Sequence, residues 1–123
     1  FMGYKDNIAE LINLCDLVVS GSLEPEPFGR TAIEAMACAK PVIAPRCGGF
    51  LETIIDRKTG LLFSCNDHED LAKKMIYLLN ESKLINKMGF DGKEMVEKKF
   101  NSQNLAREIE DVFLEIDPTG LLR

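Results

Sequence analysis

The sequence predicts an α/β fold in which a parallel sheet is flanked by helices. Three short apolar runs, at residues 17–20, 41–44 and 61–63, have the length and composition of buried strands. Each run is followed by a segment with the periodicity of a helix, and strands that alternate with helices pair in parallel. The chain has 123 residues, 46% of them apolar, which suffices for one domain with its own core.

The first third of the chain predicts two strands, each followed by a helix. A strand at 1–3 precedes a helix that Asp6 or Asn7 can cap, and the apolar face of this helix carries Ile8, Leu11 and Ile12. The strand at 17–20 leads through a loop rich in proline and glycine into a helix at 31–38. That loop therefore follows the carboxyl end of a strand, where open parallel sheets bind ligands.

The middle of the chain repeats this alternation. The strand at 41–44 leads into a turn at Gly48-Gly49 and a short helix at 50–55, and we expect Gly60 to stop that helix. The strand at 61–63 follows. Asp67 then caps an amphipathic helix, whose apolar residues are Leu71, Met75, Leu78 and Leu79.

The last part of the chain is predicted to be helical, with helices at about 82–99 and 102–116. The acidic and basic residues between Lys93 and Lys99 are typical of a solvated helix face with i,i+4 ion pairs. Residues 1–116 are expected to form one domain, and 117–123 a tail that ends the helical pattern at Pro118 and Gly120.

The loop before the helix at 31–38 carries the most informative residues. Glu26 and Glu34 lie eight positions apart, one in the loop and one in the helix. Gly29 lets backbone approach a ligand closely, and a helix that starts near Gly29 or Arg30 presents free N–H groups that suit phosphate. Glu34 lies roughly 6 Å further along the helix. A nucleotide sugar has this order of groups, with hydroxyls on both sides of a pyrophosphate, and carboxylates accept hydrogen bonds from such hydroxyls.

These residues resemble the E-x7-E motif of retaining GT-B glycosyltransferases of the family 4, or group 1, type. The resemblance extends from residue 1 to about 113 through further segments in the same order. They are Phe1-Met2-Gly3-Tyr4, the run Glu34-Ala35-Met36-Ala37-Cys38-Ala39-Lys40-Pro41-Val42-Ile43-Ala44, Cys47-Gly48-Gly49-Phe50-Leu51-Glu52, Thr59-Gly60-Leu61-Leu62-Phe63 and Asp67-His68-Glu69-Asp70-Leu71-Ala72. Two positions depart from the family pattern, because Ala39 stands where glycine is usual and Gly21 where proline is frequent.

The resemblance implies a Rossmann-like sheet that is part of the C-terminal, donor-binding domain of a GT-B enzyme. In such an enzyme a sugar moves from a nucleotide diphosphate sugar to a glycan, lipid or small-molecule acceptor, as in polysaccharide biosynthesis, without a metal or another cofactor. The acceptor-binding N-terminal domain, and an Arg and a Lys that hold the diphosphate, would precede residue 1. We therefore expect this chain alone to be inactive.

The resemblance also implies a role for each site residue. The donor sugar would contact Glu26, Phe28, Gly29 and Arg30, and the phosphates would contact Arg30 and Thr31. Glu34 would bind the ribose hydroxyls, and Gly3 and Tyr4 would lie beside the base. No residue is identified as catalytic with certainty, and Glu26 is the best candidate.

For several of these residues, a purely structural role is an alternative to ligand binding. Arg30 is equally well explained as a solvated first-turn residue, Tyr4 as a packing residue, and Gly48-Gly49 as an ordinary turn. Glu26, outside such a motif, would be read as a solvated loop acid. For Glu34, apolar neighbours on its helix predict a partly enclosed carboxylate that needs a partner.

Composition excludes other classes of function. The net charge of −5 and the isoelectric point near 4.9 argue against nucleic-acid binding and against a broad basic membrane face. The four cysteines form no C-x-x-C pair, so zinc is not expected, and we interpret them as reduced thiols, with Cys15 and Cys38 packed among apolar residues. His68, the only histidine, has no nucleophile pattern near it. A cytoplasmic location follows, with a peripheral position of the parent enzyme at the inner membrane face left open.

Two alternatives to the transferase reading remain, a GT-B sugar-nucleotide epimerase and a non-catalytic binding module. The pair Glu26 and Glu34, followed by Ala35-Met36-Ala37, favours the transferase. The first residue is Phe and falls in a strand pattern, so we interpret the chain as part of a longer protein with a strand edge left uncovered. Such an edge favours self-association of the chain.

Overall fold

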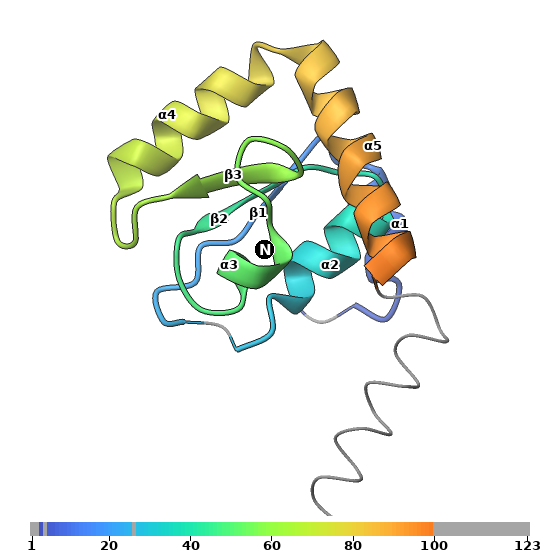
Figure 1. Ribbon diagram of the computed structural model, residues 1–123, viewed down its shortest axis with the longest axis horizontal. Coiled ribbons are helices and arrows are strands. Elements are labelled where there is room, and N and C mark those ends of the chain that lie inside the picture. Colours follow the sequence, from blue (N-terminus) through green and yellow to red (C-terminus); the bar gives the residue numbers. More distant parts are fainter. Residues whose placement is uncertain (1–2, 4, 26, 100–123) are drawn as a thin grey trace, which may run out of the picture.

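The structure is a computed structural model that describes residues 3, 5–25 and 27–99. A parallel three-stranded sheet in the order β1-β2-β3 lies at its centre. The strands are β1 (Val18–Val19), β2 (Val42–Pro45) and β3 (Gly60–Phe63). Five helices surround them in the described part of the chain (Figure 1): α1 (Ile8–Asn13), α2 (Arg30–Ala37), α3 (Phe50–Thr53), α4 (His68–Leu79) and α5 (Ser82–Lys99). The predicted α/β, Rossmann-like class is confirmed.

Both faces of the sheet are covered, which explains why the strands are apolar without alternation. One face of the sheet packs against α2 and α3 through a core that contains Met36, Val42, Phe50 and Leu62. The opposite face packs against α4, through Ile43, Leu61, Phe63 and Leu78. Helix α5 contributes Met88 to the second core and Val96 to the first, so it packs against both cores at one end of the sheet (Figure 1).

The close packing of α5 on α2 depends on two glycines. A Cβ at Gly89 would lie 2.1 Å from the carbonyl oxygen of Ala39, and a Cβ at Gly92 would lie 2.9 Å from the Met36 side chain. Either contact is too short for a real side chain, so glycine is required where α5 crosses the end of α2. This packing of α5 holds α2 in place, and with it the helix start that was predicted to face the ligand.

Several sequence predictions need correction at the level of elements. Strand β1 is shorter than the predicted run, β2 is shifted by one residue, and β3 starts one residue earlier than predicted. Gly60 therefore begins β3 instead of stopping α3, which ends at Thr53. Gly60 is needed there because a Cβ would lie 2.3 Å from the carbonyl oxygen of Val42 on the neighbouring strand. Gly3 has a φ of +70° and is not part of a strand.

The helix faces are partly as predicted. Asp67 caps α4 by accepting a hydrogen bond from the Asp70 N–H at 3.0 Å, as expected. Leu79 is 53% exposed, so it does not belong to the apolar face of α4, and Ile8 on α1 is 42% exposed. At the start of α1, Asn7 donates to the Glu10 carboxylate instead of capping the backbone.

Two further predictions concern charged and thiol side chains. On α5, Lys93 pairs with Glu97 and Lys98 with Glu94, as the charge pattern indicated. The packing prediction for the cysteines is wrong for Cys15, which is exposed, whereas Cys38 is half-buried. Cys15 follows the last turn of α1, where its thiol donates to the Leu11 carbonyl instead of entering the core.

Residues 1–2 of the predicted strand at 1–3, the predicted helix at 102–116 and the tail at 117–123 lie outside the described residues. Within the described part of the chain, no helix combines the length and apolarity needed to cross a bilayer.

Candidate functional site

The loop between β1 and α2 ends in an unusual helix start. Gly29 is the N-cap of α2 and has a left-handed φ of +60°, which glycine adopts without strain. The cap lacks a side-chain hydrogen bond. The helix begins at Arg30, so the first backbone N–H groups of α2 point out of the end of the helix instead of toward a preceding helical turn. These groups and the helix dipole give this end of α2 a partial positive charge.

A second loop supports this helix start through backbone contact. Gly49, in the turn between β2 and α3, packs so closely on the first loop that a Cβ there would lie 2.6 Å from the Phe28 carbonyl carbon and 2.7 Å from the Gly29 nitrogen. From the other side, a Cβ at Gly29 would lie 2.6 Å from the Thr53 hydroxyl oxygen. That buried hydroxyl donates to the Gly49 carbonyl at 3.0 Å. The two loops that end β1 and β2 therefore form one unit.

Glu34 lies one turn into α2 and is ion-paired with Arg30, whose Nε is 3.3 Å from its carboxylate. The Glu34 side chain is 41% exposed, while Ala35 and Met36 beside it are buried. This agrees with the prediction of a partly enclosed carboxylate with a partner. The ion pair does not bury the Glu34 carboxylate, because its partner Arg30 lies on the surface with 84% of its side chain exposed.

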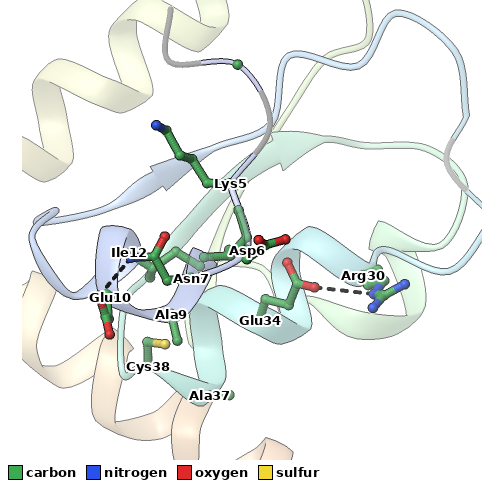
Figure 2. A pocket seen from close by; sticks show the side chains of 12 residues that line it. Lys5, Asp6, Asn7, Ala9, Glu10, Ile12, Arg30, Glu34, Ala37 and Cys38 are labelled. Atoms are coloured by element: carbon green, nitrogen blue, oxygen red, sulfur yellow. Dashed lines mark hydrogen bonds and ion pairs between the residues drawn. The ribbon is translucent and has the colours of Figure 1, made fainter.

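A cavity of about 900 Å³ lies between α2 and the segment that leads into α1. Gly3, Arg30 and Glu34, which come from two distant predicted motifs, all line it. Figure 2 shows Glu34 joined to Arg30 along α2, and the Asp6 side chain turned toward the same space. The structure therefore brings the residue predicted beside the base and the residue predicted for the ribose into one pocket.

Not every predicted site residue can be placed. Glu26 and Tyr4 lie outside the described residues, so their predicted roles stay predictions. Phe28 is 78% exposed and does not line this cavity, although its backbone packs against Gly49. Thr31 is half-buried at the start of α2, and His68 occupies the first turn of α4 as expected.

Sequence reasoning missed several residues that line the cavity. They are Lys5, Asp6, Asn7, Ala9, Glu10 and Cys38. Asp6 and Asn7 had been considered only as helix caps. The available signal was their position in the sequence, since they closely follow Gly3 and Tyr4, the residues predicted to lie beside the base.

Within the described residues, no group of three or more His, Cys, Asp or Glu side chains is arranged to hold a metal ion. The charged groups of the cavity are two cations and three carboxylates, which come from the segment before α1, from α1 and from α2: Lys5, Asp6, Glu10, Arg30 and Glu34. Such a surface can hold an anion at the helix start and donors such as hydroxyls at its carboxylates.

A family model described as glycosyl transferases group 1 matches residues 1–95. The chain belongs to this family. Among its relatives, the N-acetyl-alpha-D-glucosaminyl L-malate synthase of Bacillus anthracis is 36% identical over 116 residues, which cover 94% of this chain and 30% of that protein. An uncharacterised glycosyltransferase of Methanocaldococcus jannaschii is 39% identical over 111 residues, which cover 90% of this chain and 31% of that protein. This group 1 chain thus spans about 30% of the length of these curated relatives.

Solved structures agree with the family assignment. The Anabaena protein HepE, solved in complex with UDP-glucose, superposes with a TM-score of 0.87 at 28% identity, covering 92% of this chain and 31% of HepE. The C-terminal domain of a group 1 glycosyl transferase from Francisella tularensis superposes with a TM-score of 0.73 at 32% identity, covering 83% of this chain and 52% of that one. Both superpositions agree with the group 1 family model that matches residues 1–95.

Proposed function

We propose that this chain is the donor-binding part of a retaining GT-B glycosyltransferase of the family 4 type, which transfers a sugar from a nucleoside diphosphate sugar to an acceptor. The observation that supports this most directly is the cavity in which Gly3, Arg30 and Glu34 meet beside the N-terminus of α2. The UDP-glucose complex of HepE supports a nucleotide sugar as the ligand, since that protein shares this fold over 92% of the chain.

The proposed arrangement assigns each part of the ligand to one part of the site. The ribose hydroxyls donate to the Glu34 carboxylate, and the base lies toward Gly3 and Tyr4. The diphosphate faces the N–H groups of Arg30 and Thr31, and the donor sugar lies toward Glu26, Phe28 and Gly29. Negative charge develops on the diphosphate as the glycosidic bond breaks, so the fixed dipole of α2 would stabilise the transition state more than the ground state.

Arg30 has a defined task in this arrangement. Its guanidinium is held by Glu34 at 3.3 Å, yet it is largely exposed, so it can approach a phosphate without an unpaired charge becoming buried. Arg30, the start of α2 and residues outside this chain then balance the negative charge of the diphosphate. We propose that no metal ion is required.

The remaining parts of the proposal concern the setting of the enzyme. The acceptor site lies on a further domain, and the enzyme acts in the cytoplasm, where thiols stay reduced. Strand β1 is an edge in the described sheet, since β2 is its one partner there. We propose that this edge supports self-association of the isolated chain, which sedimentation at micromolar concentrations would show as a dimer and disprove as a monomer at all concentrations.

The test is an assay of the full-length protein that contains this chain against a panel of UDP, GDP and ADP sugars. We expect release of the nucleoside diphosphate by hydrolysis or transfer with at least one donor, unchanged by a metal chelator. Retained anomeric configuration in the product would support the retaining mechanism, and inversion would contradict it. A folded protein that consumes no donor in the panel, or that only epimerises one, would refute the transferase proposal.

A further inference from the structure

Two cysteines lie together at the edge of the sheet that carries the site. Strands β2 and β3 are parallel, and their register pairs Pro45 with Phe63. Cys47 and Cys65 each follow two residues after these partners. Neighbouring strands are about 4.8 Å apart, and the Cα atoms of a disulfide are about 4.4–6.8 Å apart. Residues at matching positions just beyond a registered pair are therefore close to the separation that a disulfide bridges.

Backbone hydrogen bonds fix both positions beyond the strand ends. The Arg46 N–H donates to the Phe63 carbonyl at 2.8 Å, which extends the strand pairing by one step. The Cys47 N–H turns back to the Pro45 carbonyl at 2.8 Å. On the other strand, Cys65 lies in a tight turn that the Asp67 N–H closes by donating to the Ser64 carbonyl at 3.0 Å. The loops therefore cannot carry the two cysteines far apart.

The Cys65 thiol is close enough to that of Cys47 to perturb it. A hydrogen bond with the Cys65 side chain, followed by burial and the Cys65 charge, raises the pKa of the Cys47 thiol. Cys65 is exposed and Cys47 half-buried, and both are free thiols. Cys15 and Cys38 come from α1 and the end of α2, so this is a pair set apart from the other two cysteines.

We propose that Cys47 and Cys65 are a redox pair that hydrogen peroxide converts into a reversible disulfide bond. The bond would join the β2–α3 turn to the β3–α4 loop. Cys47 directly precedes Gly48-Gly49, so the modification site borders the loop unit that supports the start of α2.

The chemistry balances with peroxide as the oxidant. The Cys65 thiolate attacks one peroxide oxygen, the O–O bond breaks, and the leaving hydroxide takes a proton to become water. Cys65 is then a sulfenic acid. The Cys47 sulfur attacks the Cys65 sulfur, the S–O bond breaks, and the hydroxyl leaves with the Cys47 proton as a second water. Two thiols have lost two electrons to one peroxide, and a dithiol such as dithiothreitol reverses the change by exchange.

Tryptic mapping tests this assignment, because each cysteine falls in a different tryptic peptide. Cys47 lies in 47–57 and Cys65 in 59–73, whereas Cys15 lies in 6–30 and Cys38 in 31–46. The chain is treated with hydrogen peroxide, its remaining thiols are alkylated, and the digest is analysed by mass spectrometry without reduction. We expect one linked species, 47–57 joined to 59–73, with Cys15 and Cys38 alkylated and the link absent after dithiothreitol.

Matched variants separate the pair from general thiol oxidation. The double variant Cys15→Ser/Cys38→Ser should keep the link, and Cys65→Ser should lose it while Cys47 stays open to alkylation. A link between any other two peptides would overturn the proposal. So would conversion of Cys65 to a sulfinic acid while Cys47 remains free. The mapping needs no nucleotide, so its outcome is independent of the proposed transferase function.

Discussion

At the scale of single residues, Glu34 links the fold to the proposed ligand. It is the acid that lines the cavity from α2, and its Arg30 partner leaves it accessible. In the full-length enzyme, Glu34→Ala should reduce sugar transfer roughly 10- to 150-fold, because a hydrogen bond to a charged group contributes about 1.5–3 kcal/mol. Glu26→Ala should have a similar effect.

The matched control for this change is Glu69→Ala, which removes an exposed acid from the first turn of α4. Steady-state kinetics with a sugar nucleotide would compare the three variants, and circular dichroism would confirm that each is folded. Rates at the wild-type level in both Glu26→Ala and Glu34→Ala would refute the assignment of these acids to the donor.

Asp56 gives a pH-dependent prediction. Burial raises the pKa of its carboxyl, but the Leu62 N–H at 2.9 Å and the Arg46 guanidinium at 2.7 Å outweigh this and hold the pKa below its ordinary value. A depressed folded-state pKa stabilises the protein above the unfolded pKa of about 4, and this stabilisation is lost as the pH falls through the folded pKa.

We therefore expect Asp56→Asn to lower the free energy of unfolding at pH 7 by about 1–3 kcal/mol. The difference from wild type should shrink progressively below about pH 4. Urea unfolding at a series of pH values measures it. A difference that stays constant from pH 7 to pH 3 would show that the charge of Asp56 does not hold β3 in place.

At the scale of elements, the contact between the two glycine loops positions the start of α2. Gly49→Ala would place a methyl group 2.6 Å from the Pro27 carbonyl oxygen, so the loops must separate. Such overpacking costs about 1–3 kcal/mol and should also weaken nucleotide binding, because α2 loses its support. Thermal unfolding and a nucleotide titration measure the two effects.

Gly21→Ala is the control for this contact, because a Cβ at Gly21 meets nothing within 4 Å. We expect that variant to match wild type in both measurements. If Gly49→Ala also left thermal unfolding and nucleotide binding unchanged, the loops would not be the rigid unit that the backbone contacts indicate.

The turn after α2 explains why glycine is usual at position 39, where this chain has alanine. Ala39 has a φ of +57°, a left-handed conformation that disfavours residues with a side chain and is a position where glycine is usual after a helix. Ala39→Gly should raise the free energy of unfolding by about 0.5–1 kcal/mol, the left-handed penalty less the entropy that glycine loses. Ala37→Gly, inside α2, should instead lower it by a similar amount. Destabilisation by Ala39→Gly would contradict this explanation.

The accuracy of the sequence-based predictions differs between elements, and the differences have physical reasons. The start of α2 was predicted within a residue, because Gly29 marks the boundary by its conformational freedom. The role of Gly60 was mistaken, because sequence shows that glycine breaks a pattern but not which backbone approaches it. The cavity was predicted in part. Gly3, Arg30 and Glu34 follow from motifs, whereas Asp6 lines it only because α1 and α2 lie side by side.

At the scale of the whole molecule, the chain holds one wall of the proposed site. The helix start and Glu34 are present, while the residues that would complete the diphosphate site lie outside this chain in the proposed enzyme. A site of this kind should bind a nucleoside diphosphate with a dissociation constant no lower than about 1 mM, or roughly 4 kcal/mol. Much tighter binding would mean that this chain carries the complete site.

The most direct test of the central claim is an NMR titration of the chain with UDP, GDP and ADP, followed through the backbone amide signals. We predict that amides in 28–34 shift first, together with those of Gly48 and Gly49, with an affinity near the millimolar range. Glu34→Ala should weaken the response. Shifts confined to 70–99, on α4 and α5, or no response of the helix start to any of the three nucleotides, would show that the start of α2 is not the nucleotide site.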